Sequence, residues 1–151
     1  MWSLRTELVT RLRGGKEALE GMRYVLDHAR APRAELAFFA LAAAQRDVTA
    51  ADTARLSDLT DDLRQSPTGR YVQALFALRA GDPAAAAEHF PAAAPQPDGR
   101  HLYLWAMAEL MRGDGAPDGR AKELLEQLLR DYPSSSLARN AGSFVRQLSP
   151  R

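Results

Sequence analysis

The sequence predicts an all-α fold from composition and from the spacing of its apolar residues. The 151 residues include no isoleucine and only five valines, whereas alanine and leucine are the two most frequent residue types. Strands favour β-branched residues and helices favour Ala and Leu. Apolar residues also recur every three or four positions between Gly and Pro residues, which is typical of amphipathic helices.

Helix signals follow one another along the chain. Leu4, Leu8 and Leu12 predict a helix before Gly14-Gly15, and a second helix is expected over about 16–29. Pro32 begins a third helix. Thr49, with Asp52 three residues later, has the pattern of a capping box and predicts a fourth helix that continues through Leu56, Leu59 and Leu63.

The later helices begin with N-cap residues or follow loops. Ser66-Pro67 begins a fifth helix that ends at Gly81, and Asp82-Pro83 begins a sixth that Pro91 shortens or kinks. We expect a seventh helix over about 100–112 and an eighth over about 120–130. The last helix follows Pro133 and ends near Leu148.

The prolines at the boundaries of helix pairs recur at a nearly constant interval. Pro32, Pro67, Pro97 and Pro133 are separated by 35, 30 and 36 residues. A fixed period of this length indicates stacked helical hairpins. The prediction is one domain over 1–151, with an irregular bundle as the alternative; its expected parts are helix pairs over about 1–31, 32–66, 67–97 and 98–133 and a closing helix over 134–149.

These repeats resemble the tetratricopeptide repeat (TPR) family, whose pattern has a Trp, a Leu-Gly and an aromatic residue in and after the first helix, an Ala before an aromatic residue in the second helix, and a closing Pro. The matching positions are Gly14, Ala18, Met22 and Pro32; Gly81-Asp82, Ala86, Phe90 and Pro97; and Trp105-Ala106, Gly113-Asp114, Ala121, Leu125 and Asp131-Tyr132-Pro133. Residues 33–66 depart from the pattern because Asp58 follows Ala54 where an aromatic is expected. The resemblance implies a right-handed superhelix whose first helices line a concave groove.

A stripe of apolar residues is repeated on two of these first helices. Tyr71, Leu75 and Leu78 recur 32 residues later as Tyr103, Met107 and Leu110, and Arg79 becomes Met111. Given the resemblance, these residues are candidates for the surface that binds a peptide or partner helix, with Arg79, Arg100 and Arg139 at its edge to hold a carboxylate. The alternative is that the stripe packs inside the protein.

The sequence contains no pattern that indicates catalysis. His28, His89 and His101 lack partners at metal-ligand spacing, Asp61 and Asp62 point about 100° apart on a helix, and the Asp-Gly loop over 114–119 lacks a calcium-ligating Glu. We therefore expect no enzyme activity, no metal and no cofactor. The leading hypothesis is a non-catalytic protein-interaction module; the alternatives are a homodimerising structural module or the sensor or docking portion of a larger regulator.

Charge and cysteine content limit the partners and the location. The 20 Lys+Arg nearly balance the 19 Asp+Glu, and no segment is strongly basic, so we expect no nucleic-acid partner. No uninterrupted apolar run reaches 18 residues, so we expect no membrane partner. The absence of cysteine suits a reducing compartment, which predicts a cytoplasmic location.

Overall fold

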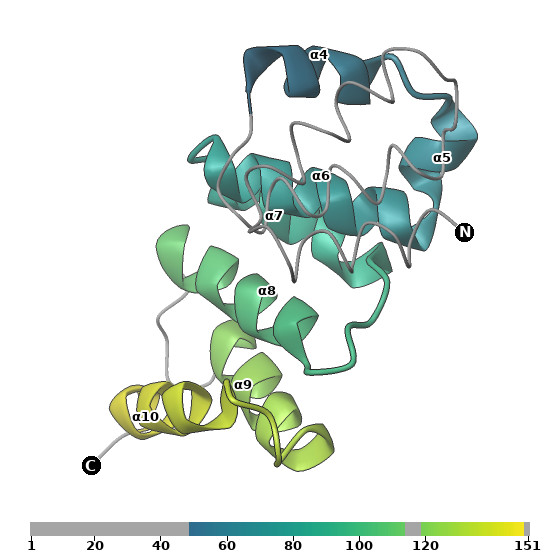
Figure 1. Ribbon diagram of the computed structural model, residues 1–151. Coiled ribbons are helices and arrows are strands. Elements are labelled where there is room, and N and C mark those ends of the chain that lie inside the picture. The colour runs from purple at the N-terminus through teal and green to yellow at the C-terminus, as the bar shows by residue number, and fades with distance from the viewer. Residues whose placement is uncertain (1–48, 114–118, 150–151) are drawn as a thin grey trace, which may run out of the picture.

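The computed structural model describes residues 49–113 and 119–149, and these residues are helical without any strand, as the composition predicts (Figure 1). The helices expected before residue 49, with Gly14, Ala18, Met22, His28 and Pro32, lie outside the described residues, as does 114–118. The elements are α4 (Ala50–Ser57), α5 (Asp61–Gln65), α6 (Pro67–Arg79), α7 (Pro83–His89), the 3₁₀ turn η1 (Phe90–Ala92), α8 (Arg100–Met111), α9 (Arg120–Asp131) and α10 (Ala138–Leu148).

The expected fourth helix begins as predicted but is not continuous. The Thr49 side chain accepts from the Asp52 backbone N–H at 3.2 Å, and the Asp52 carboxylate accepts from the Thr49 N–H at 3.1 Å, which completes the capping box. The prediction that this helix continues through Leu59 and Leu63 is wrong, because α4 ends at Ser57 and α5 starts at Asp61. Thr60 has an extended backbone, and the two acidic residues after it favour a new helix N-terminus.

Side-chain caps and prolines set the limits of α6 and α7 as expected. Ser66 accepts from the Gly69 N–H at 3.1 Å and Asp82 accepts from the Ala85 N–H at 3.0 Å. Gly81 has a φ of 76° between the two helices, a conformation that glycine adopts at little cost. Pro91 lies in η1, so α7 ends at His89 and the chain continues as a tighter turn.

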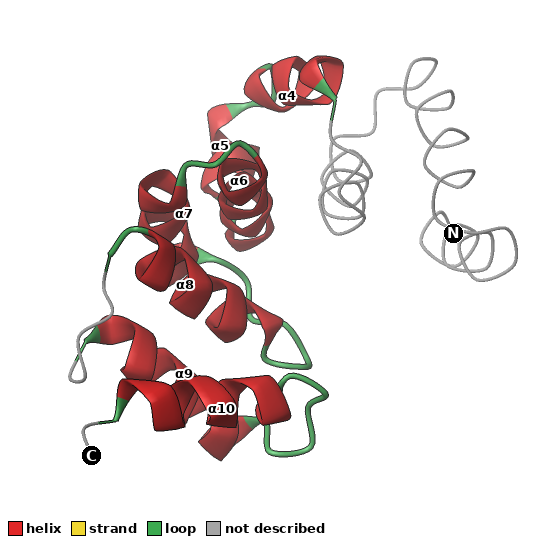
Figure 2. Cartoon of the chain, turned by 90° about the vertical axis from the view of Figure 1, so that its left-hand side faces the viewer, coloured by secondary structure: helices red, strands yellow, loops and turns green. Residues whose placement is uncertain are grey.

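From α5 to α10, each helix packs mainly on its neighbours in the sequence: α5 on α6, α6 on α7, α7 on α8, α8 on α9 and α9 on α10. Figure 2 shows this succession from α4 to α10 along the described part of the chain. Short connections, such as the three residues between α6 and α7, make packed neighbours antiparallel. None of the helices in the described ranges is long and apolar enough to cross a membrane.

Buried side chains form two clusters that share α8. The first core cluster is built mainly from α6, α7 and η1, and Ala108 of α8 joins it; its other members are Leu56, Leu59, Tyr71, Val72, Ala74, Leu75, Phe76, Ala86, Ala87 and Phe90. The second core cluster consists of Leu102, Ala106, Leu124, Leu125, Leu128 and Ala141. Trp105 packs against both clusters. Because α8 contributes to both, it occupies the centre of the described packing.

Candidate functional site: one face of α8

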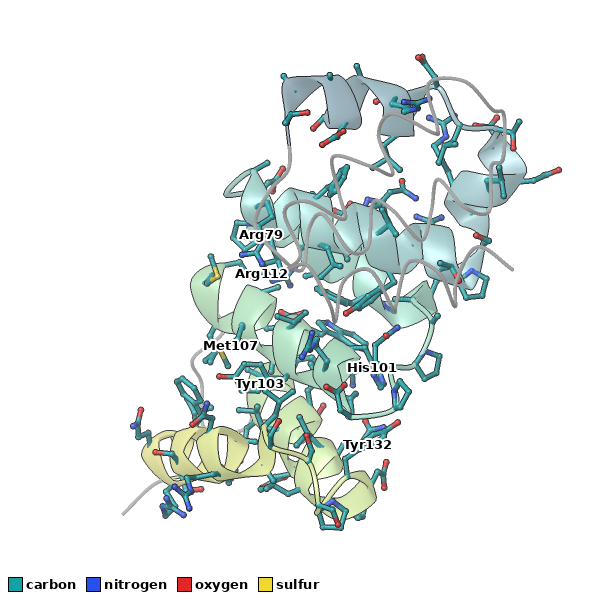
Figure 3. The ribbon with its side chains drawn as sticks, viewed as in Figure 1. Arg79, His101, Tyr103, Met107, Arg112 and Tyr132 are labelled. Carbon is teal, nitrogen blue, oxygen red and sulfur yellow. The ribbon has the colours of Figure 1, made fainter. Side chains whose placement is uncertain are left out.

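The candidate surface is the face of α8 that neither core cluster fully covers. Positions 100, 103, 107, 110 and 111 lie within about one third of the helix circumference at 3.6 residues per turn. None of these residues is buried: Tyr103, Met107 and Leu110 are half-buried, and Arg100 and Met111 are exposed. Figure 3 shows Tyr103 and Met107 along α8, with Arg112 toward its end. We call this set of five residues the α8 face.

The remaining circumference of α8 is used for packing. Leu102 and Ala106 are buried in the second core cluster and Ala108 in the first. Tyr103 and Met107 border the second core cluster and pack partly against it. Met111 is 60% exposed and is the exposed large hydrophobic residue of the described ranges. The α8 face is therefore half-buried at its middle and exposed at the C-terminal end of the helix.

The structure places the two copies of the predicted stripe in different surroundings. On α6, Tyr71 is 7% and Leu75 is 5% exposed, and both belong to the first core cluster, against which the half-buried Leu78 also packs. On α8, the equivalent residues remain accessible. The α6 copy thus contributes to packing in the structure, and the accessible part of the predicted surface lies on α8.

Cationic residues lie at both ends of this region. Arg100 is exposed and lies 3.5 Å from the Asp98 carboxylate. Arg79 is exposed at the end of α6, and Arg139 is exposed on α10. Arg112 follows Met111 and contacts the carboxylate of Glu109 at 2.9 Å. Of these residues, Arg100 belongs to the α8 face, and a guanidinium at the margin of an apolar face suits a ligand that carries a carboxylate.

Tyr71 connects α6 electrostatically to the start of α8. Burial raises the pKa of the Tyr71 phenol above its ordinary value, because the phenolate would lose hydration; the nearby Arg100 opposes this rise and Asp98 adds to it. Both charged groups belong to the loop and first turn that begin α8. The phenol of Tyr71 therefore lies within electrostatic reach of the N-terminal end of the α8 face.

Sequence reasoning missed a polar group on the opposite side of α8. The Trp105 indole N–H donates to Glu109 at 3.2 Å, and the Arg120 guanidinium lies 4.8 Å from the centre of the Trp105 ring. The i, i+4 spacing of Trp105 and Glu109 and the i, i+3 spacing of Glu109 and Arg112 could have indicated part of this group. No sequence periodicity links Arg120, on the next helix, to Trp105.

The histidines of the described ranges serve as hydrogen-bond acceptors. The Nδ1 atom of His101 accepts from the Gln96 backbone N–H at 2.8 Å, and the Nδ1 atom of His89 lies 3.0 Å from the guanidinium of Arg70. Asp61 is solvated and forms an ion pair with Arg64, as the prediction of an exposed acidic face requires. Within 49–113 and 119–149, no three His, Asp or Glu residues are grouped as metal ligands would be.

Comparisons of the chain with protein-family models, with curated proteins and with solved structures found no match.

Proposed function

We propose that this protein is a non-catalytic interaction module, a TPR-like superhelix of helix pairs that binds a peptide or partner helix on the α8 face. The observation that supports this function is the α8 face itself: a helix packed on both core clusters still presents Tyr103, Met107 and Leu110 half-buried and Met111 open. Tyr and Met side chains provide adaptable apolar contacts, which suit binding and not catalysis. The cytoplasmic location expected from the sequence is part of this proposal.

The spacing of the side chains on the α8 face indicates how a partner would bind. Side chains at positions 103, 107 and 110 or 111 follow each other along about two turns of α8, so they suit the i, i+4, i+7 anchors of a partner helix. Arg100 lies at the N-terminal end of the face. A ligand with apolar anchors and a carboxylate near one end would make complementary contacts.

The experiment places negative charges at the two exposed ends of the α8 face, where substitutions do not disturb packing. The double variant Arg100→Glu with Met111→Glu changes the net charge by −3. The control variant, Arg130→Glu with Ala84→Glu, has the same charge change on exposed positions of α9 and α7. Partners retained on the immobilised protein are compared for wild type and both variants. We expect the control to retain the partner and the α8-face variant to lose it; equal retention by both variants contradicts the proposal.

A second variant tests the middle of the face. Tyr103→Ala with Met107→Ala removes the two apolar side chains that also border the second core cluster. We expect partner capture to be abolished while the melting temperature falls only slightly. A loss of several kcal/mol, at about 2–5 kcal/mol per truncated core side chain, would assign these residues to the core.

Self-association is distinguished from partner binding by mass. Molar mass is measured over a series of protein concentrations for wild type and for the Arg100→Glu, Met111→Glu variant. A monomer at all concentrations agrees with docking of a different protein. A dimer that the variant dissociates would instead show that the α8 face joins two copies of this chain.

A further inference from the structure

The loop between α7 and α8 is held to the start of α6 by a chain of hydrogen bonds. The Ala94 N–H donates to the Pro67 carbonyl at 2.9 Å, and the Gln96 side-chain amide donates to the Ala94 carbonyl at 3.1 Å. The Gly99 N–H then donates to the Gln96 carbonyl at 3.0 Å. The segment 94–99 is thus a structured joint between the packed helices α6 and α7 and the packed helices α8 and α9.

His101, in the first turn of α8, contacts this segment. The Gln96 backbone N–H donates to Nδ1 of His101 at 2.8 Å. The same ring packs edge-on against Tyr132, which follows α9, with ring centres 5.9 Å apart and planes at 86°. One imidazole therefore contacts the loop, belongs to α8 and packs on the end of α9. Figure 3 shows His101 and Tyr132 near the beginning of α8.

The hydrogen bond requires a neutral ring. Nδ1 accepts the hydrogen bond from the Gln96 N–H only while it keeps its lone pair, so the proton of the neutral imidazole lies on Nε2. A proton added at Nδ1 would place an N–H donor against the Gln96 N–H donor at 2.8 Å, and neither would have an acceptor there. Protonation and this hydrogen bond therefore exclude each other.

The surroundings of the ring favour the neutral form. Burial lowers the pKa of His101, and Asp98 in the loop partly opposes this effect. Asp98 forms an ion pair with Arg100 at 3.5 Å, and the side chain that faces the ring from the end of α9 is Tyr132. His101 also lies in the first turn of α8, where the helix dipole disfavours a cation.

We propose that His101 is an acid-sensitive latch: protonation of its Nδ1 breaks the bond to Gln96 and releases the 94–99 loop, which loosens the joint between α6–α7 and α8–α9. The neighbours of His101 on α8 include Arg100 and Tyr103 of the α8 face. Release of the loop would therefore shift the orientation of this face relative to α6. The latch is a property of the fold and does not depend on the proposed ligand.

His89 provides a matched comparison within the same protein. Its Nδ1 also lies against a donor, the Arg70 guanidinium, and its pKa is lowered by burial and by Arg70, with Glu88 opposing. This contact joins α6 to α7 within one packed pair, and Arg70 is also bonded to Gln65. Protonation of His89 should therefore leave the 94–99 loop unchanged.

The test is a pH titration of the whole chain by ¹⁵N nuclear magnetic resonance, from about pH 7.5 to about pH 4, because the pKa of His101 is lowered. At the upper pH we expect His101 to be neutral with its proton on Nε2. As His101 titrates, the hydrogen-exchange protection factor of the Gln96 amide, corrected for the intrinsic pH dependence of exchange, should fall by about tenfold or more. A ring carrying its proton on Nδ1 at pH 7.5, or Gln96 protection that does not follow the titration of His101, overturns the proposal.

Two variants assign the effect to one histidine. His101→Asn removes the titration but keeps a side-chain oxygen that can accept, so Gln96 protection should become independent of pH in this range. His89→Asn should retain the wild-type response at Gln96. Loss of the response in His89→Asn, or its persistence in His101→Asn, would contradict the latch. Should His101→Asn fail to fold, the wild-type tautomer and titration decide the question alone.

Discussion

The indole N–H of Trp105 donates to one carboxylate oxygen of Glu109 at 3.2 Å, one turn further along α8. The other oxygen of Glu109 forms an ion pair with Nε of Arg112 at 2.9 Å, and the Arg120 guanidinium of α9 lies over the Trp105 ring. Glu109 is only 6% exposed, and a buried carboxylate is tolerated when each oxygen has a donor. This group therefore fastens the last turns of α8 to the beginning of α9.

Removing the Glu109 carboxylate should cost more than neutralising it. Glu109→Ala leaves the Trp105 indole N–H without its acceptor, and we expect the free energy of unfolding to fall by about 1–3 kcal/mol. Glu109→Gln keeps one oxygen that can accept from the indole N–H, so its free energy of unfolding should fall by less. Urea unfolding of both variants measures the difference, and equal losses would show that the hydrogen bond to Trp105 contributes nothing.

Gly99 should tolerate alanine less well than Gly81 does. Both glycines have positive φ, 74° and 76°, so alanine carries a backbone cost of about 1–2 kcal/mol at either position. At Gly99 a Cβ atom would also lie 2.8 Å from Cδ2 of Tyr132, whereas at Gly81 nothing lies within 4 Å. Thermal unfolding should therefore show a larger drop for Gly99→Ala. A similar drop in both would mean that the Tyr132 ring moves aside freely.

Gly69 and Gly142 should respond to alanine with opposite signs, although both lie inside helices. A Cβ at Gly69 would clash with the backbone carbonyl oxygen of Leu63, so α5 would have to move away from α6. At Gly142 the nearest atom is the end of the Arg146 side chain at 3.7 Å, and alanine should stabilise α10 by about 0.5–1 kcal/mol. Chemical denaturation measures the change in the free energy of unfolding for both variants. Stabilisation by Gly69→Ala would contradict the close contact of α5 and α6.

Ala121 should not accept a larger side chain. It is fully buried on α9, where α8 and α9 pack together, and Ala121→Leu would force extra atoms into this contact. We expect a loss of about 1–3 kcal/mol and a lower melting temperature. An unchanged melting temperature would count against close packing of the two helices at this position.

Tyr71 should make the protein less stable at alkaline pH. Burial raises the pKa of Tyr71, so above about pH 10 the unfolded chain releases this proton before the folded protein does. Stability is therefore intact below the unfolded pKa and is lost as pH rises toward the folded one. Tyr71→Phe should reduce this loss when the free energy of unfolding is compared at about pH 8 and above pH 10, and an unchanged slope would contradict the effect.

Local sequence signals predicted the helix boundaries well where one residue determines them. Ser66, Asp82 and the pair Thr49 and Asp52 cap their helices with their own side chains, so a short stretch of sequence contains the whole cause. The break between Ser57 and Asp61 was missed because the regular spacing of Leu56, Leu59 and Leu63 predicts one continuous helix. In the structure both Leu56, in α4, and Leu59, in the connection between α4 and α5, are buried.

The candidate surface could be predicted only in part. The apolar stripe is visible from its spacing on α6 and α8, but its exposure depends on which helices pack against it. Tyr71 and Leu75 are buried, whereas their counterparts Tyr103 and Met107 are half-buried, although the stripes have the same pattern. The contact of His101 with Gln96 was not predictable, because it depends on the path of an irregular loop and not on a helical period.

The packing of each helix on its neighbours in the sequence also determines how fast the described part of the chain can fold. Between α5 and α10, the contacts that bury the core close only short loops, so little chain entropy is lost before each new contact forms. Helical proteins with such local contacts fold in about microseconds to milliseconds. We expect this region to refold on that timescale after dilution from denaturant, with α8 completing both core clusters as it docks.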